Sequence, residues 1–188
     1  ALGIALAFLR HEPARTSEQA GIVLTLLAAG TLVLTALAAV QTVKGALRTR
    51  RCHQLLARCG QRMDLPGFPL PAWRIAAPFP VAAVSGVVSP RLILSSRLMD
   101  ECTPDELAIV VRHEAAHARR RDNFLRSCLL ALPDLFGFLK GGDIVAREWQ
   151  HAVEEAADDE AVRSEPAARL TLAGALVRVG RMTAGPPP

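Results

Sequence analysis

The longest uninterrupted apolar run in the chain covers residues 21–43, "GIVLTLLAAGTLVLTALAAVQTV", where 23 consecutive positions carry no charge. At about 1.5 Å per residue, a helix of this length crosses the ~30 Å hydrocarbon core of a bilayer. A buried core helix usually shows a polar stripe or ends sooner, and a secretory signal has a shorter apolar run followed by a cleavage site. The pattern therefore predicts a transmembrane helix over residues 21–43.

Charges on either side of this run predict its orientation. Before it, Arg10 and Arg15 are offset by Glu12 and Glu18, whereas after it the basic residues are Lys44, Arg48, Arg50, Arg51, Arg58 and Arg62. Positive residues collect on the cytoplasmic side, so we expect everything after residue 43 to be cytoplasmic and residues 44–64 to form a basic juxtamembrane helix beside the lipid. Residues 1–20 are expected to be the end of a preceding span and an external loop. The expected setting is a bacterial-type cell membrane, crossed several times by the full protein.

The pattern changes after residue 64. Proline and glycine are frequent between residues 65 and 90, and short apolar pieces at 73–76, 81–84 and 92–95 predict the strands of a small sheet. A helix should begin after Thr103, because a threonine N-cap, Pro104 and Glu106 together make a capping box with proline at the first helical position. Further helices are expected at about 144–162 and 167–178. The predicted fold is α+β and mainly helical, with a domain over residues 65–180 and a linker over 181–188.

One apolar segment leaves two interpretations open. Residues 124–139, "FLRSCLLALPDLFGFL", are apolar but interrupted by Arg126, Pro133 and Asp134. The segment is too short for a full span, so it is either a hairpin that skims the membrane or a hydrophobic core helix.

Composition changes this picture only slightly. The chain is 51% hydrophobic, which fits a membrane segment, and its net charge of +4 is too small to indicate a nucleic-acid partner. Its four cysteines form no CxxC pair, so we expect reduced, unpaired thiols, as in a domain on the cytosolic side. The chain begins with alanine and ends in three prolines, and we expect it to be a piece of a longer protein.

Candidate chemistry lies in "VVRHEAAHARRRD", residues 110–122. On a helix, His113 and His117 are about 40° apart and share a face, while Glu114 is turned about 100° from the first histidine. This HExxH pattern is typical of zinc metalloproteases, in which the glutamate is the general base. The histidines lie at the edge of the apolar face, where an unpaired imidazole is costly and coordination would remove that cost. Two chance histidines on an amphipathic helix are the plainer alternative.

Catalytic zinc usually takes three protein ligands, so a third is expected elsewhere. The candidate segment is "EWQHAVEEAADDEAV", residues 148–162. An apolar arc drawn through Val145, Trp149, Ala152, Val153 and Ala156 places Glu155 beside it and turns Glu154 and Asp158 toward solvent. Glu155 is therefore the predicted third ligand, and Asp159, four residues on, is predicted to hold a ligating histidine by its other nitrogen. His151 is a possible oxyanion or substrate contact, or a spectator.

The stretch "GVVSPRLILSSRLMDECTPDELAIVVRHEAAHARRRDNFL", followed by "EEAADDEAV", resembles the membrane metallopeptidases of the BlaR/MecR type, which are similar in turn to the HtpX/Ste24 membrane proteases. The resemblance covers roughly residues 80–180. It implies a gluzincin-like zinc domain facing the cytosol, with His113, His117 and Glu155 as zinc ligands and Glu114 as base. No penicillin-binding domain lies within these residues, so the resemblance extends to the peptidase activity and leaves the stimulus open.

The sequence therefore predicts a membrane-embedded zinc endopeptidase that acts on a protein substrate, such as a transcriptional repressor or a membrane protein, in regulatory signalling. The strand around residues 91–95 is expected to be an edge onto which an extended substrate pairs. Two alternatives remain: a signal-transducing membrane protein whose zinc fold is regulatory and not catalytic, and a membrane-anchored helical scaffold without metal.

Overall fold

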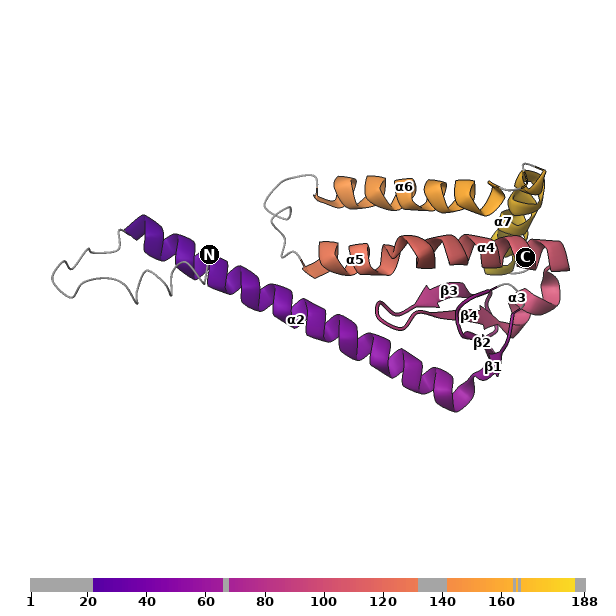
Figure 1. Cartoon of the computed structure of the whole chain (residues 1–188), viewed down its shortest axis with the longest axis horizontal. Coiled ribbons are helices and arrows are strands. Elements are labelled where there is room, and N and C mark those ends of the chain that lie inside the picture. The colour runs from indigo at the N-terminus through magenta and orange to yellow at the C-terminus, as the bar shows by residue number, and fades with distance from the viewer. Residues whose placement is uncertain (1–21, 66–67, 132–141, 164, 166, 185–188) are drawn as a thin grey trace. The chain divides into compact units, whose positions relative to one another are not determined.

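The computed structural model describes residues 22–65, 68–131, 142–163, 165 and 167–184, and the chain divides into two compact units, residues 1–36 and 37–188. Its elements are mostly helices, with one small sheet (Figure 1). The predicted α+β class, with a long apolar helix ahead of a mainly helical domain, is confirmed.

The predicted span and the basic segment after it belong to one helix. Helix α2 runs from Ile22 to Cys59, and its apolar part passes the length and composition test for a membrane-crossing helix. Large side chains along that part, such as Leu26 and Leu32, are exposed. The helix ends at Cys59, before the predicted residue 64: the Gly60 N–H makes the last helical hydrogen bond, to the Leu56 carbonyl oxygen, and a strand begins at the next residue.

The sheet has four strands: β1 (Gln61–Met63), β2 (Ala72–Ile75), β3 (Ala82–Ser85) and β4 (Arg91–Ser95). Their order is β1-β2-β4-β3, with β2 and β4 parallel and the outer pairs antiparallel. Strand β4 is therefore central, and its residues 92–95 are buried. The prediction that residues 91–95 form the free edge is wrong, since that edge belongs to β3.

Helix α4, Pro104–Arg120, begins as predicted: the Thr103 hydroxyl accepts from the Glu106 N–H, and the Glu106 carboxylate accepts from the Thr103 N–H. A short helix α3, Ser96–Glu101, precedes it. One face of α4 packs on the sheet, in a cluster whose buried members are Ala72, Leu92, Leu94 and Leu98. An adjoining face packs on α6 (Gly142–Val162) and α7 (Ala168–Ala184), in a cluster whose buried members are Ile109, Ala161, Val162, Ala168, Leu172 and Ala175.

Helix α5, Asp122–Ala131, follows α4 directly, after Arg121 adopts a left-handed conformation with φ of 57°. Its side chains Phe124, Leu125 and Leu129 are exposed, so the core-helix interpretation fails for this part. Residues 132–141 of the same segment lie outside the described residues. Helix α7 continues to residue 184 with Met182 buried, so the linker predicted from residue 181 begins inside a helix.

Candidate metal centre

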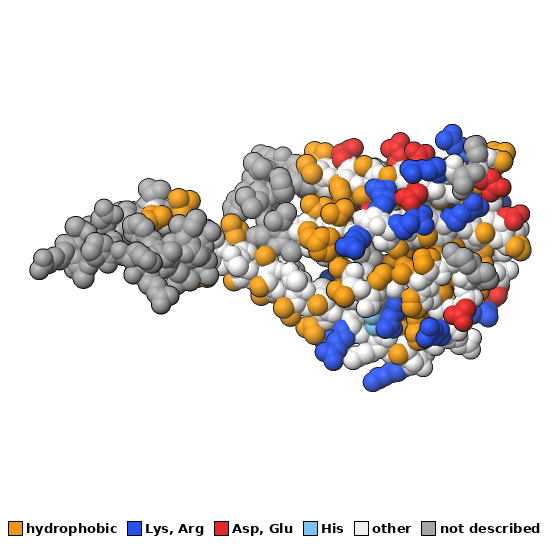
Figure 2. Space-filling model, in the orientation of Figure 1, with side chains coloured by type: hydrophobic (Ala, Val, Ile, Leu, Met, Phe, Trp, Pro, Cys, Tyr) orange, Lys and Arg blue, Asp and Glu red, His pale blue; other side chains and the backbone are white. Residues whose placement is uncertain are grey.

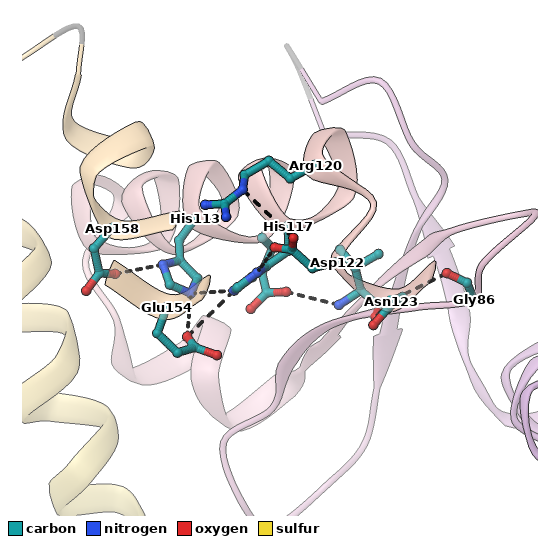
Figure 3. A network of polar contacts seen from close by, with 10 residues as sticks. Gly86, His113, His117, Arg120, Asp122, Asn123, Glu154 and Asp158 are labelled. Atoms are coloured by element: carbon teal, nitrogen blue, oxygen red, sulfur yellow. Dashed lines mark hydrogen bonds and ion pairs between the residues drawn. The ribbon is translucent and has the colours of Figure 1, made fainter. Parts of the chain in front are cut away.

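Three side chains from two helices meet at one point (Figure 3). The Nε2 atoms of His113 and His117 lie 3.0 Å apart, one turn from each other on α4. Glu154 reaches across from α6 and places Oε2 3.5 Å from His113 Nε2 and 3.7 Å from His117 Nε2. Each residue offers one donor atom to a common centre.

A carboxylate oxygen lies close to the Nδ1 atom of each histidine. Asp158 Oδ1 on α6 lies 2.8 Å from His113 Nδ1. Asp122 Oδ2, in the first turn of α5, lies 2.8 Å from His117 Nδ1 and is itself buried. Arg120 Nε is 3.8 Å from the other oxygen of Asp122. These contacts leave both Nε2 atoms facing the centre, which is the ring orientation that coordination of a metal through Nε2 requires.

Glu114 lies beside the histidines on α4, on the side of the helix nearer the sheet. Its side chain is buried, and Oε2 accepts a hydrogen bond from the Val84 N–H of β3 at 3.0 Å. Burial raises the pKa of Glu114, while the nearby imidazoles and the Val84 hydrogen bond lower it and leave a net rise. A buried carboxylate with a raised pKa suits a group that must accept a proton and then return it.

Edge strand β3 is fixed to the helices on the same side. Asn123 Nδ2 donates to the Val84 carbonyl oxygen at 2.7 Å and lies 3.4 Å from the Gly86 carbonyl oxygen. At the end of β3, His53 Nε2 of α2 lies 3.4 Å from the Ser85 carbonyl oxygen. Sequence analysis did not single out Asn123 or β3 as parts of the site, because their role depends on a contact between segments about 39 residues apart.

A cavity of about 350 Å³ opens over the centre. Residues of β3, α4, α5 and α6 line it. Its lining residues are Ala82, Ala83, Val84, His113, Glu114, His117, Asp122, Asn123, Arg126, Trp149, Gln150, Val153 and Glu154. The histidines, the buried glutamate and a free strand edge therefore face one space.

Sequence analysis placed the two α6 carboxylates one residue too late. Glu155 and Asp159 are exposed and lie outside the group of donors, which contains Glu154, with Asp158 behind it. The arc used for the prediction included Val145 and Ala152, which are exposed, whereas the buried stripe runs through Val153, Ala157 and Ala161. A stripe with that i, i+4 spacing would have placed Glu154 and Asp158 at its border. His151 is exposed and does not line the cavity.

The family model described as BlaR1 peptidase M56 matches residues 10–185, which is nearly the whole chain. A search of curated proteins finds no match. The family is one of membrane-associated metallopeptidases, and both the apolar helix and the histidine–carboxylate group fit that description. The chain therefore belongs to the BlaR1 peptidase M56 family.

Proposed function

We propose that this chain is a zinc-dependent endopeptidase of the gluzincin type, with His113, His117 and Glu154 as the metal ligands. Zinc binds imidazole nitrogen and carboxylate oxygen at about 2.0–2.2 Å, so donors in a tetrahedral set are roughly 3.3 Å apart. The three donor atoms here are separated by 3.0, 3.5 and 3.7 Å. That agreement with a zinc-sized centre is the observation on which the proposal rests.

Zinc in this position would supply Lewis-acid activation of a water molecule and of the scissile carbonyl group. Glu114 adjoins both histidines in the cavity and is not in the donor group. It would accept a proton from the attacking water and deliver it to the leaving amine nitrogen as the peptide C–N bond breaks. Asp158 and Asp122 would keep the two imidazole rings oriented throughout.

Strand β3 is the proposed binding edge for an extended substrate. In its antiparallel pairing with β4, alternate residues turn their backbone groups away from the sheet. The outward N–H of Val84 donates to Glu114, and its outward C=O accepts from Asn123. Ala82, two residues earlier, faces the same way and lines the cavity, so it can pair with a peptide beside the centre.

The basic residues after the apolar part of α2 support a cytoplasmic position for this site. There the substrate would be a protein in regulatory signalling, such as a transcriptional repressor or a membrane protein. The second candidate is a zinc fold that regulates without cleaving. Buried Glu114 favours catalysis, because a structural site usually closes with four ligands and needs no base.

Two adjacent glutamates provide a matched test of the ligand assignment. Glu154→Gln should lower bound zinc well below the wild-type equivalent, whereas Glu155→Gln should leave it unchanged, because only the first side chain reaches the histidines. Zinc content is measured by atomic emission on the purified chain in detergent. Equal zinc in the two variants would contradict the assignment, and no zinc in the wild type would favour the scaffold interpretation.

Catalysis is tested separately with Glu114→Gln. This variant should retain zinc and lose cleavage by roughly a hundredfold or more, as expected for removal of a general base. Cleavage is measured on an unstructured protein such as casein and on the chain itself. If the wild-type protein binds zinc but cleaves both substrates no faster than Glu114→Gln does, the regulatory alternative is supported.

A further inference from the structure

Beside the cavity, α5 and the start of α6 carry apolar side chains that no described part of the chain covers. We define this α5–α6 apolar surface by Phe124, Leu125 and Leu129 of α5 and Ile144 and Val145 of α6. Between 44% and 57% of each of these residues is exposed. Figure 2 shows hydrophobic side chains gathered at this end of the molecule, with basic side chains among them.

Its α5 part is a continuous stripe. At 100° per residue, Phe124, Leu125, Cys128 and Leu129 span an arc of about 140°, and Cys128 is exposed within it. Arg126 lies at the border of this arc and forms no ion pair with the described residues. On α6 the apolar positions 144–146 are followed by Arg147 and Glu148, so charged residues border the surface along that helix.

The amino-acid sequence between the two helices has the same character. Residues 132–141, "LPDLFGFLKG", contain five leucines and phenylalanines and only two charged residues. The chain is thus largely apolar from the exposed turn of α5 to the exposed start of α6.

We propose that the α5–α6 apolar surface enters the interfacial layer of the lipid bilayer as a second membrane contact of this chain. The bilayer is the occupant that the residues favour, since α2 already provides a helix apolar enough to hold the chain at a membrane. Arginine beside exposed leucine and phenylalanine also matches an anionic lipid surface, where the guanidinium reaches the headgroups while the apolar side chains enter the acyl region.

This contact would set the position of the cavity relative to the membrane. Asn123 and Arg126 line the cavity from the same turns of α5 that carry Phe124 and Leu125, and Trp149 lines it from α6 just beyond Val145. The cavity would therefore open close to the bilayer surface. The membrane contact itself does not depend on zinc or on cleavage, so it stands or falls separately from the proposed enzymatic function.

The natural Cys128 offers a probe site within the surface. The other cysteines, Cys52, Cys59 and Cys102, are replaced by alanine, and the full chain is labelled at Cys128 with an environment-sensitive fluorophore. It is then reconstituted into vesicles of phosphatidylcholine and phosphatidylglycerol, with or without brominated acyl chains. We expect the brominated lipid to lower the emission at Cys128 at least about twofold, as it does for a probe that reaches the acyl region.

Two cysteine positions in a chain without native cysteines provide the controls. Leu176→Cys on α7 has a similar exposure, 56% for the native leucine, and should not be quenched. Val33→Cys in the apolar part of α2, also 56% exposed, should be quenched and shows that the protein is inserted. Quenching at Val33→Cys without quenching at Cys128 would overturn the proposal. A blue-shifted but unquenched probe at Cys128 would also overturn it, by showing that another protein surface covers the stripe.

Discussion

At the scale of single residues, two carboxylates behind the histidines do most to organise the centre. Asp158 and Asp122 each approach an Nδ1 atom at 2.8 Å and so leave both Nε2 atoms directed at Glu154. Asp122 is 7% exposed on its side chain, whereas Asp158 is 38% exposed. The two histidines are therefore held in unequal surroundings, one by a buried carboxylate and one by a carboxylate partly in water.

Asp158→Asn should weaken zinc binding by roughly 10- to 100-fold, the usual cost of losing the partner that orients a ligating imidazole. Asp159→Asn removes the same charge one position away and should change the affinity less than about twofold, because Asp159 is exposed and does not contact a histidine. Competition for zinc with a fluorescent chelator measures both affinities. Equal losses in the two variants would show that net charge, and not contact with His113, governs the affinity.

The histidines and Glu114 could be predicted from the sequence because one helical turn brings i and i+4 together without any tertiary information. The third donor could not be located so well. Both Glu154/Asp158 and Glu155/Asp159 have a spacing of four, so only the rotation of α6 against α4 decides between them. That rotation depends on Val153, Ala157 and Ala161 packing inward, and two of these are alanines with little hydrophobic signal of their own.

At the scale of elements, α4 is the helix that every part of the site uses, and its start is unusually well fixed. Glu106 completes the capping box with Thr103 and also pairs with Arg178 of α7, whose Nε lies 2.9 Å from Oε2. The hydrogen bond from the Thr103 backbone N–H is the main cause that lowers the pKa of Glu106. One side chain thus ties the start of α4 to the helix packed across it.

Glu106→Gln should lower the Tm of the detergent-solubilised chain at neutral pH by roughly 2–4 °C, corresponding to about 1 kcal/mol for a chain of this size. A lowered folded-state pKa means that this stabilisation is present above the ordinary value of 4.5 and is lost as pH falls through the folded value. The difference from wild type should therefore shrink below about pH 4.5. A difference that stays constant across that range would contradict the ionic role of Glu106.

The turn after β3 is fixed by Gly86, which has a φ of 106°. An added Cβ would lie 2.7 Å from the Ser89 carbonyl oxygen and 3.1 Å from His53 Cε1. Gly86→Ala should therefore destabilise the fold by about 1–3 kcal/mol. Gly180→Ala, in α7 with open space around the position, should be neutral or stabilising by up to about 1 kcal/mol. Thermal unfolding of both variants tests this, and equal Tm values would show that the turn tolerates a side chain.

The scale of elements also shows where sequence patterns failed. Strands at 72–75, 82–85 and 91–95 lie close to their predicted positions, and the capping box placed the start of α4 correctly. The order of the strands could not be predicted from the sequence. Strand β4 pairs in parallel with β2 and so lies between β2 and β3, which leaves β3 at the edge of the sheet. Strand β1 was missed because "QRM" is short and mostly exposed and continues a basic stretch that resembles a helix.

At the scale of the whole molecule, the chain joins an apolar helix long enough for a membrane to a domain with a metallopeptidase-type centre. Basic residues follow the apolar part of α2 and predict that the domain lies on the cytoplasmic side. Orientation is a property of the chain in its membrane and is open to a direct labelling test.

Cys59, the exposed last residue of α2, should react with a membrane-impermeant maleimide only after cells are permeabilised, in a variant where the other three cysteines are alanine. Ser17→Cys, on the side predicted to be external, should react in intact cells in the chain without native cysteines. Mass shift on a gel measures both reactions. Labelling of Cys59 in intact cells would reverse the predicted orientation.

The last turns of α2 end against the strand that lines the cavity. His53 contacts the Ser85 carbonyl oxygen, and the residue before Ser85 provides the N–H that holds Glu114. Only one peptide unit of β3 therefore separates the contact of His53 from the hydrogen bond that Glu114 accepts. A displacement of His53 would act on that same carbonyl group, so the hydrogen bond that positions Glu114 depends on where the last turns of α2 lie against β3.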